Sequence, residues 1–439
     1  MTSDDGLRLV PFRGLRYAPD RVSSLTAVTS PPYDVVVRPE GVHHLETADP
    51  YNIVRLILPQ AEDPATRHDR AARTLRAWRA EGVLVQDAAP ALYVYEQRDA
   101  RGLQRGLIGA LRLDGPVLPH EDVIPEVVAD RAALMRAAGA QLEPLLLSYD
   151  GSDARGSSGP DTASPSAARA GAARVVERAV HRPPLLHTVT EDGVAHRLWA
   201  VTDPAEQAEA TTDLATRRAL IADGHHRWAT YRQLWRERVL AGGEGAESPW
   251  AHGLVLLVDT ARHPLRVQAI HRVLPHLPYP EAVTKAAPYF RVRQVAGPLP
   301  QALEALSGAQ GTAFLLAGEQ DGAAEFHLLD RPDPTLLDRT VPGDKPRAWR
   351  ELDATVLHSA LLEEVWRVPD DAVSISYLHE ASAALTQARH RRGTAVLLRP
   401  TSERTVRELA EQGVTMPRKS TSFGPKPATG LVLRLVEEG

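Results

Sequence analysis

A short apolar run that ends in an acid and a glycine and passes directly into a helical pattern restricts the fold of this chain more than any other feature. The stretch "RALIADGHHRWATYRQLWRERVL" spans residues 218–240. Its apolar start predicts a short buried strand ending at Asp223, and Gly224 permits a sharp turn. Large apolar and aromatic side chains then recur at close to helical spacing from Trp228 onward. The sequence therefore predicts a strand, a tight turn and a helix in direct succession.

The first third of the chain mixes strand and helix patterns. "YNIVRLILP" is typical of a buried strand bounded by proline, and a helical pattern follows at 65–81. "ALYVYEQR" and "QRGLIGALRLD" have the β-branched and aromatic content of two paired strands. These patterns predict an α+β fold with mixed sheets.

Composition changes along the chain predict five regions. "GSDARGSSGPDTASPSAARAG" is too polar and too rich in helix and strand breakers to fold alone, which indicates a flexible linker. After this segment strands and helices alternate, and beyond Leu277 short strands and weak helices indicate an inserted, smaller α/β subdomain. The expected regions are 1–150, the linker 151–171, 172–276, the insert 277–350, and 351–439.

The residue types that are missing or rare exclude several classes of protein. There is no Cys among the 439 residues, so disulfides, thiolate metal sites and a thiol nucleophile are excluded. The net charge of -5 opposes nucleic-acid binding, and no apolar run reaches membrane-spanning length. The start of the chain lacks a signal-like segment, so a cytoplasmic protein is expected.

Only four of the 51 basic residues are Lys, and two of these, Lys419 and Lys426, fall in the last 21 residues.

The turn after Asp223 has the chemistry of a phosphate site. His225, His226 and Arg227 lie on the first turn of the predicted helix, where unpaired backbone N–H groups and the positive end of the helix dipole favour an anion. Asp223, at the end of the strand, is where a Mg2+ ligand is expected, because Mg2+ commonly takes one or two carboxylates together with substrate phosphates.

Two alternatives remain open for this turn. A histidine zinc site is one, although adjacent helical residues point about 100° apart and chelate one ion poorly. The other is purely structural: Asp223 caps the helix, and the histidines bond to nearby carbonyl groups.

"IADGHHRWA" resembles the signature loop of the SerK-type free serine kinases of the ParB and sulfiredoxin superfamily. "PHE" at 119–121 is similar to the segment that supplies the catalytic glutamate of these kinases, and the C-terminal stretch that includes "MPRKSTSFGPKP" is similar to their C-terminal end. The longer pattern, with "FRGLRY", "PPYD", "YNIVRL" and "YVYEQ", resembles a large bacterial family known mainly as a domain of unknown function.

The resemblance implies a ParB/sulfiredoxin-like core around the DGHHR turn, within 172–276, and transfer of a phosphoryl group to free L-serine. ADP or ATP would be the phosphate donor, with Mg2+ as cofactor and serine or a related amino acid as the small-molecule substrate. Glu121 would be the catalytic base. The other implied catalytic residues are His226 and Asp223, and Asp223 would also be the metal ligand. The implied phosphate cradle is Gly224, His225, His226 and Arg227, and the implied substrate segment is Lys419, Ser420 and Thr421.

Other readings of the same residues remain. An anion cradle with Mg2+ and a carboxylate also suits a phosphoserine phosphatase, and the ParB likeness allows a nucleotide-operated binding module. Trp78, Trp228 and Trp235 have the spacing of core residues, and the pair His271–Arg272 indicates a local contact. Six residues in polar islands can line the same cleft, although each is also suited to structural hydrogen bonding: Arg13, Arg16, Tyr33, Asp34, Asn52 and Arg55.

Overall fold

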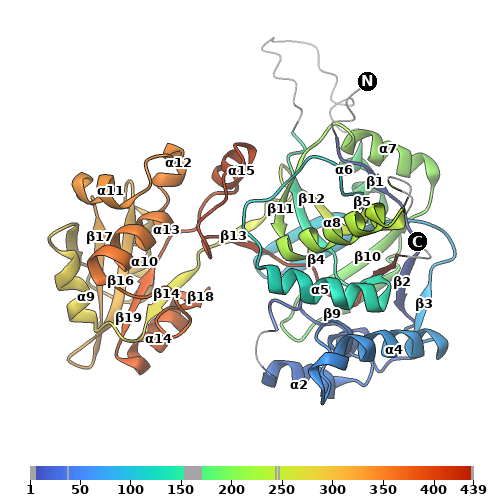
Figure 1. The fold of residues 1–439 in the computed structure, drawn as a ribbon, viewed down its shortest axis with the longest axis horizontal. Helices are drawn as coiled ribbons and strands as arrows, with labels where there is room; N and C mark the ends of the chain where they lie inside the picture. Colours follow the sequence, from blue (N-terminus) through green and yellow to red (C-terminus); the bar gives the residue numbers. More distant parts are fainter. Residues whose placement is uncertain (1–5, 37–38, 153–170, 243–244, 246–247, 437–439) are drawn as a thin grey trace, which may run out of the picture. The chain divides into compact units, whose positions relative to one another are not determined.

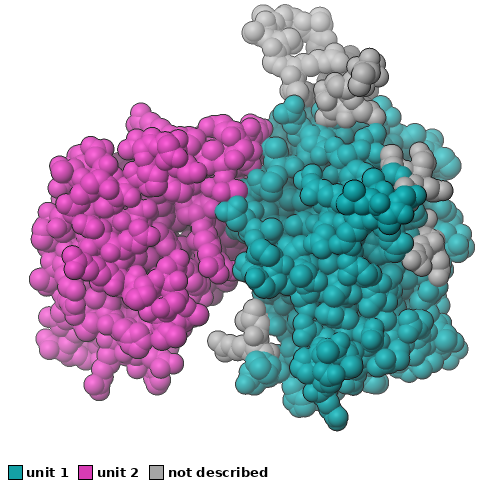
Figure 2. Space-filling model, in the orientation of Figure 1, with its two compact units in different colours: residues 1–265, 425–439 teal, residues 266–424 magenta. Residues whose placement is uncertain are grey.

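The protein is described by a computed structural model that covers residues 6–36, 39–152, 171–242, 245 and 248–436 (Figure 1). These residues form two compact units, residues 1–265 with 425–439 and residues 266–424 (Figure 2). Both units combine sheets with helices, so the α+β class predicted from the sequence is confirmed. Most of the linker predicted at 151–171 lies outside the described residues.

The first unit is built on a nine-stranded mixed sheet. Eight strands follow one path, and β1 (Leu9–Val10) pairs with β5 beside it. The path runs through β6 (Val117–Leu118), β11 (Ala219–Asp223), β8 (Leu145–Tyr149), β12 (His252–Asp259), β5 (Gly102–Arg112), β4 (Leu92–Asp99), β10 (Ala195–Val201) and β9 (Leu186–Val189).

A smaller four-stranded sheet completes the first unit. Its order is β3 (Leu84–Gln86), β2 (Gly14–Tyr17), β21 (Leu433–Leu435) and β7 (Ala140–Gln141). The end of the chain therefore returns to the first unit as an inner strand between β2 and β7.

Helices bury their apolar sides against these sheets. Trp228, Tyr231 and Leu234 of α8 join the core of the large sheet, and Leu75 and Trp78 of α4 join that of the small sheet. Trp235 is partly buried against the large core. The helices of this unit are α1 (Leu25–Val28), α2 (Pro39–Ala48), α3 (Val54–Ile57), η1 (Pro64–Thr66), α4 (Arg67–Ala80), α5 (Pro125–Ala138), α6 (Ala172–Val180), α7 (Pro204–Leu214), α8 (His225–Leu240) and η3 (Pro249–Ala251).

The strand predicted at "YNIVRLILP" is wrong, because this segment forms the short helix α3. The Asn52 side chain accepts a hydrogen bond from Val54 N at 2.9 Å and donates one to Ala27 O at 2.7 Å. A side chain that bonds its own backbone two residues ahead favours a turn over a strand. The apolar residues are still buried, as their pattern indicated, but in a helix.

The second unit contains a six-stranded sheet and a two-stranded ribbon. The ribbon pairs β13 (Arg266–Gln268) with β20 (Ser422–Gly424). The sheet order is β15 (Arg291–Gln294), β17 (Ala323–Asp330), β16 (Ala313–Gln320), β19 (Thr394–Leu397), β14 (His271–Leu274) and β18 (Ser376–Leu378). Its helices are α9 (Tyr279–Ala286), α10 (Leu299–Ser307), α11 (Pro334–Thr340), α12 (Arg347–Arg350), α13 (Asp353–Val356), the π-helix η4 (Leu357–Trp366), α14 (Ala381–Arg391) and α15 (Glu403–Glu411).

The two units divide the chain differently from the five regions expected from its composition. Strand β19, from the expected C-terminal region, lies between β14 and β16 in one sheet. Likewise β4 and β5, from the expected region 1–150, pair with β10 and β12 from the expected region 172–276. Pairing between strands that are distant in sequence joins regions that composition separates.

None of the described helices is both long enough and apolar enough to cross a membrane.

Candidate functional site

The turn between β11 and α8 forms as its sequence indicates. All five residues of β11 are buried between β6 and β8, and a register shift in the pairing with β8 lies between Ile221 and Asp223. Such irregularities re-aim a side chain at the end of a strand. Gly224 has φ 99°, a left-handed conformation that favours glycine, and α8 begins at His225 with no side-chain cap.

Glu121 lies beside this turn although it is 102 residues from Asp223 in the chain. Strand β6 pairs in parallel with β11, with Leu118 opposite Leu220, and this pairing carries the following loop to the start of α8. The Glu121 Oε2 atom is 3.8 Å from His225 Nδ1, and its Oε1 atom is 3.9 Å from His120 Nε2. About a third of the Glu121 side chain is exposed.

The two histidines of the motif hold the loop 119–124 in place. His225 Nε2 accepts a hydrogen bond from His120 N at 3.2 Å, and His226 Nε2 accepts one from Ile124 N at 3.0 Å. The His120 and His225 rings meet edge to face, with centroids 4.4 Å apart. Burial lowers the pKa of His225 well below its usual value and that of His120 to about 4. Both rings are therefore neutral near pH 7, and the Nε2 atoms of His225 and His226 each accept from a backbone N–H group.

Arg227 is buried and anchors the acid of the motif. Its Nη2 donates to Asp223 Oδ2 at 2.7 Å and its Nη1 to Pro144 O at 3.1 Å, with 3% of the side chain exposed. Burial disfavours the charge, but Glu143 and Asp223 raise the pKa of Arg227, so the guanidinium stays charged. In this arrangement the donors Nη1 and Nη2 point into the protein, and the phosphate contact predicted for Arg227 stays a prediction.

Lys426, from the far end of the chain, joins Asp223 and Arg227 in one cluster of charged side chains. Its Nζ is 2.6 Å from Asp223 Oδ1 and also forms an ion pair with Asp34 Oδ2. Burial disfavours the ammonium, but Asp223 and Asp34 raise the pKa of Lys426. Burial also opposes ionisation of Asp34, yet Lys426 lowers the pKa of that carboxyl. Burial and the neighbouring Asp34 raise the pKa of Asp223.

Backbone pairing explains why Lys426 and Asp34 meet. Ser30 and Thr429 exchange backbone hydrogen bonds of 3.1 and 2.8 Å, which places the segment after Ser30 beside the segment before Thr429. Gln97 Nε2 also donates to Lys426 O at 2.8 Å. The lysine is thus fixed through its backbone as well as through its side chain.

Tyr33 and Glu143 form the buried side of the cluster. Tyr33 N donates to Glu143 Oε1 at 2.9 Å, and the Tyr33 ring lies under Arg131, with the guanidinium carbon 4.6 Å from the ring centroid. Burial raises the pKa of Glu143, against the opposing effect of Arg227, and raises that of Tyr33 to about 12. Sequence reasoning missed His120, Glu143 and Lys426, although the shortage of lysines marked Lys426 as unusual.

The remaining residues of the polar islands have structural partners in the first unit. Arg13 Nε donates to Asp87 O at 2.8 Å, and Arg16 Nε donates to the Asp87 carboxylate at 3.0 Å. Arg55 Nη2 donates to Glu46 O at 2.6 Å, and Asn52 Oδ1 accepts from Val54 N as described. Tyr33 and Asp34 are the members of the islands that lie at the cluster.

Lys419, Ser420 and Thr421 belong to the second unit, directly before β20. Lys419 has φ 56°, so the segment turns at this residue. Their predicted role in substrate binding stays a prediction.

Asp223 does not fit Mg2+ in this arrangement, because one carboxylate oxygen contacts Lys426 and the other contacts Arg227. Within the part of the chain that the structure describes, no three His, Asp or Glu side chains gather in a way that could hold a metal ion. The predicted Mg2+ site at Asp223 therefore has no support from its surroundings.

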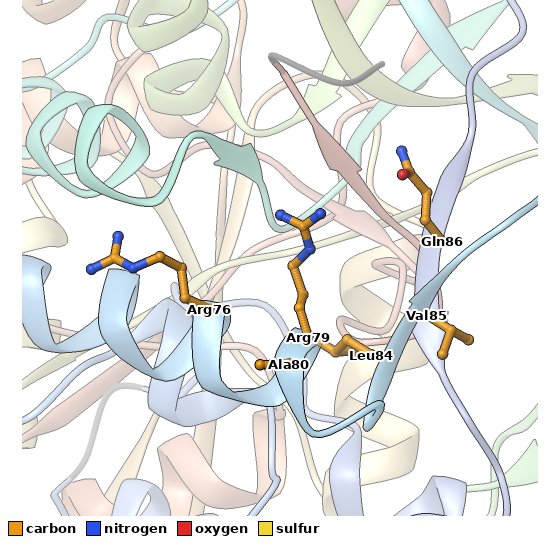
Figure 3. A pocket seen from close by; sticks show the side chains of 6 residues that line it. All are labelled: Arg76, Arg79, Ala80, Leu84, Val85 and Gln86. Atoms are coloured by element: carbon orange, nitrogen blue, oxygen red, sulfur yellow. The ribbon is translucent and has the colours of Figure 1, made fainter.

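Two hollows lie elsewhere on the first unit. One, of about 470 Å³, lies between α4 and β3, with the Arg76 and Arg79 side chains extending from the helix (Figure 3). The other, of about 330 Å³, has Arg105, Asp259 and His263 among its lining residues. Neither hollow is lined by Glu121 or Asp223, so the candidate site is defined by its cluster of side chains.

A family described as "Protein of unknown function (DUF1015)" matches residues 9–355. The chain belongs to this family. The match confirms the likeness to a family of unknown function that the sequence indicated, whereas membership of the ParB/sulfiredoxin superfamily stays a prediction. A comparison with curated proteins found no match.

Solved structures resemble the chain only weakly. A free serine kinase variant in complex with AMP is 15% identical, over 80% of this chain and 94% of that chain, with a TM-score of 0.36. A conserved hypothetical protein from Pyrococcus furiosus is 14% identical, over 76% and 97%, with a TM-score of 0.35. SbnI from Staphylococcus aureus, with a C-terminal truncation, is 12% identical, over 75% and 87%, with a TM-score of 0.34. Similarity at this level identifies no shared activity.

Proposed function

We propose that this protein is a small-molecule phosphotransferase that transfers a phosphoryl group from ADP or ATP to the hydroxyl of free L-serine or a related amino acid. The observation that carries the proposal is the position of Glu121. A partly exposed glutamate is brought by the β6–β11 pairing to the amino-terminal end of α8, beside His225, which follows Asp223 by two residues. The sequence likeness of "IADGHHRWA" and "PHE" to free serine kinases motivates the choice of reaction.

Phosphoryl transfer requires mainly positioning and charge neutralisation, together with a base for the alcohol proton. In the proposed reaction the serine oxygen forms a bond to the terminal phosphorus of the nucleotide, and the bridging P–O bond breaks. The hydroxyl proton passes to the Glu121 carboxylate. The products are O-phosphoserine and AMP from ADP, or O-phosphoserine and ADP from ATP.

The chain offers a cation for the phosphate and residues that position the base. Lys426, with 23% of its side chain exposed, is the cation of the cluster that reaches solvent. His225 and His226 hold the Glu121 loop through backbone hydrogen bonds, so we assign them positioning roles. Any Mg2+ would arrive with the nucleotide, and no residue of this chain is assigned to hold it.

Direct product analysis tests the proposal. The purified full-length chain is incubated with Mg2+, L-serine and either ADP or ATP, and nucleotides and O-phosphoserine are quantified by chromatography. We expect O-phosphoserine in equal amount to AMP or ADP, and loss of product on omission of serine. A parallel incubation with Mg2+ and O-phosphoserine alone distinguishes a phosphatase, which would release inorganic phosphate. Release of phosphate without any kinase product would replace the proposal with the hydrolase reading.

A further inference from the structure

Two carboxylates of the cluster converge on one cation. Asp34 comes from the segment after the Ser30–Thr429 bridge, and Asp223 ends β11. The Lys426 ammonium contacts Oδ2 of Asp34 and Oδ1 of Asp223. These contacts place one positive charge between two negative ones.

Each carboxylate oxygen of Asp223 already contacts a cationic side chain. Arg227 contacts Oδ2 at 2.7 Å and Lys426 contacts Oδ1 at 2.6 Å, and 10% of the Asp223 side chain is exposed. A Mg2+ ion requires oxygen ligands at about 2.0–2.1 Å in near-octahedral geometry, so it cannot share an oxygen position with an ammonium group. Lys426 therefore occupies the position between Asp34 and Asp223 that a shared metal ion would need.

The lysine is held in this position by more than its charge. Its carbonyl oxygen accepts from Gln97 Nε2, and the nearby Ala428 N donates to Tyr95 OH at 3.1 Å. Gln97 and Tyr95 both belong to β4, in the large sheet. A backbone fixed to the sheet keeps the ammonium group close to the two carboxylates, whereas a metal ion would bind only at a sufficient free concentration.

We propose that Lys426 takes the place of a metal ion at Asp34 and Asp223, so that a built-in ammonium group is the cation at this site. Where the site binds a phosphate, which rests on the proposed function, Lys426 rather than a metal held by Asp223 contacts the phosphate from the exposed side. Asp34 and Asp223 then act as positioning residues for Lys426.

Titration with Mn2+ in the absence of nucleotide and serine tests whether Lys426 takes the place of a metal ion. Free Mn2+ is measured by electron paramagnetic resonance for the wild type, Lys426→Met and Lys426→Arg. We expect no Mn2+ site in the wild type or in Lys426→Arg. In Lys426→Met we expect one new site, at least about tenfold tighter than any wild-type binding, because two carboxylates are then free to share a divalent ion. The double variant Lys426→Met/Asp223→Asn should lose this site.

Matched variants keep the test decisive. Lys285→Met removes a lysine that pairs with Glu281 on the surface of the second unit, and it should not create a Mn2+ site. If Lys426→Met does not fold, as judged by circular dichroism, Lys426→Gln replaces it. A wild-type protein that binds one Mn2+ ion, lost in Asp223→Asn and unchanged in Lys426→Met, would overturn the proposal. So would a folded Lys426→Met variant that gains no site.

Calorimetric titration with ADP separates this proposal from the proposed function. In the wild type we expect the affinity for ADP to be similar with and without EDTA, which removes divalent metal ions. In Lys426→Met we expect the affinity for ADP to fall by at least about tenfold, as for one lost charge-assisted contact. ADP binding that requires Mg2+ in the wild type, or that Lys426→Met leaves unchanged, would overturn the phosphate contact of Lys426. If ADP binds neither the wild type nor the variants and the Mn2+ results are as expected, the proposed function is rejected. The proposal that Lys426 takes the place of a metal ion is then still supported.

Discussion

Glu121 is the residue whose removal should separate catalysis from folding. Its side chain is about one-third exposed and makes contacts longer than 3.5 Å with two neutral histidines. Glu121→Gln keeps its shape and removes the base, so we expect kcat for O-phosphoserine formation to fall by about 10²–10⁴-fold. The melting temperature should change little, because substitutions at exposed positions usually alter stability by less than about 0.5 kcal/mol.

Asp122 supplies a matched control in the same loop, since it is an exposed neighbouring carboxylate. Asp122→Asn should leave kcat within about twofold of the wild type, as expected for an exposed residue that contacts no reacting atom. A Glu121→Gln variant with wild-type kcat would contradict the role of Glu121 as base.

At this scale the sequence identified part of the cluster. Asp223 and its neighbours could be placed because a strand, a glycine and a helix follow one another directly, and local order fixes their relative positions. Lys426 and Asp34 could not be placed together, because their meeting depends on a backbone bridge between Ser30 and Thr429. No local pattern encodes a contact across nearly the whole chain.

Hydrogen exchange tests whether His226 of α8 positions the loop 119–124. His226 Nε2 accepts from Ile124 N, the residue before α5. We expect His226→Ala to release this N–H and to raise the exchange rate of the Ile124 amide by at least about fivefold, because one net hydrogen bond contributes about 1 kcal/mol. Amide exchange of peptides covering 119–126, followed by mass spectrometry, measures the change.

A histidine outside the site provides the comparison. His44 on α2 forms an exposed ion pair with Glu191, and His44→Ala should leave exchange at 119–126 unchanged. Unaltered exchange of the Ile124 amide in His226→Ala would contradict the positioning role.

Elements with strong local patterns were predicted well. The helix at "SERTVRELAEQG" begins after Ser402, whose Oγ accepts from Thr405 N at 3.1 Å, as its capping pattern indicated. The pairing of β6 with β11 was not predicted, because β6 has two residues and carries no periodicity. That short pairing nevertheless decides where Glu121 lies.

For the molecule as a whole, buried histidines make stability depend on pH. Burial lowers the pKa of His120, His196, His252, His271 and His358 to about 4, from an ordinary value of 6.5. The unfolded chain therefore binds protons at a higher pH than the folded chain does. The stabilisation is complete above pH 6.5 and is lost as the pH falls toward 4. A single group shifted by this amount contributes roughly 3 kcal/mol.

Urea unfolding between pH 7.5 and 4.5 measures this dependence. We expect the free energy of unfolding to fall steadily below pH 6.5, and His196→Gln to make the fall less steep, because one titrating group is removed. A free energy of unfolding that is constant from pH 6.5 to 4.5 would contradict the expectation.

The division into units could be predicted only in part, since composition marks loops but not strand pairing. The short strands and weak helices beyond Leu277 indicated a separate subdomain. Strand β19 nevertheless pairs with β14 and β16, although it comes from the C-terminal region that was expected to be distinct. Strand order in a sheet follows from long-range packing, which a single sequence does not display.

The return of the chain to the first unit has a consequence for synthesis on the ribosome. Strand β21 and Lys426 follow residues 266–424, so the second unit must be translated before the small sheet can gain its inner strand. At about 5–20 residues per second this delay lasts roughly 10–30 seconds. During that time the edges of β2 and β7 lack their partner and are open to pairing with other nascent chains, so early chaperone binding should favour the yield of native protein.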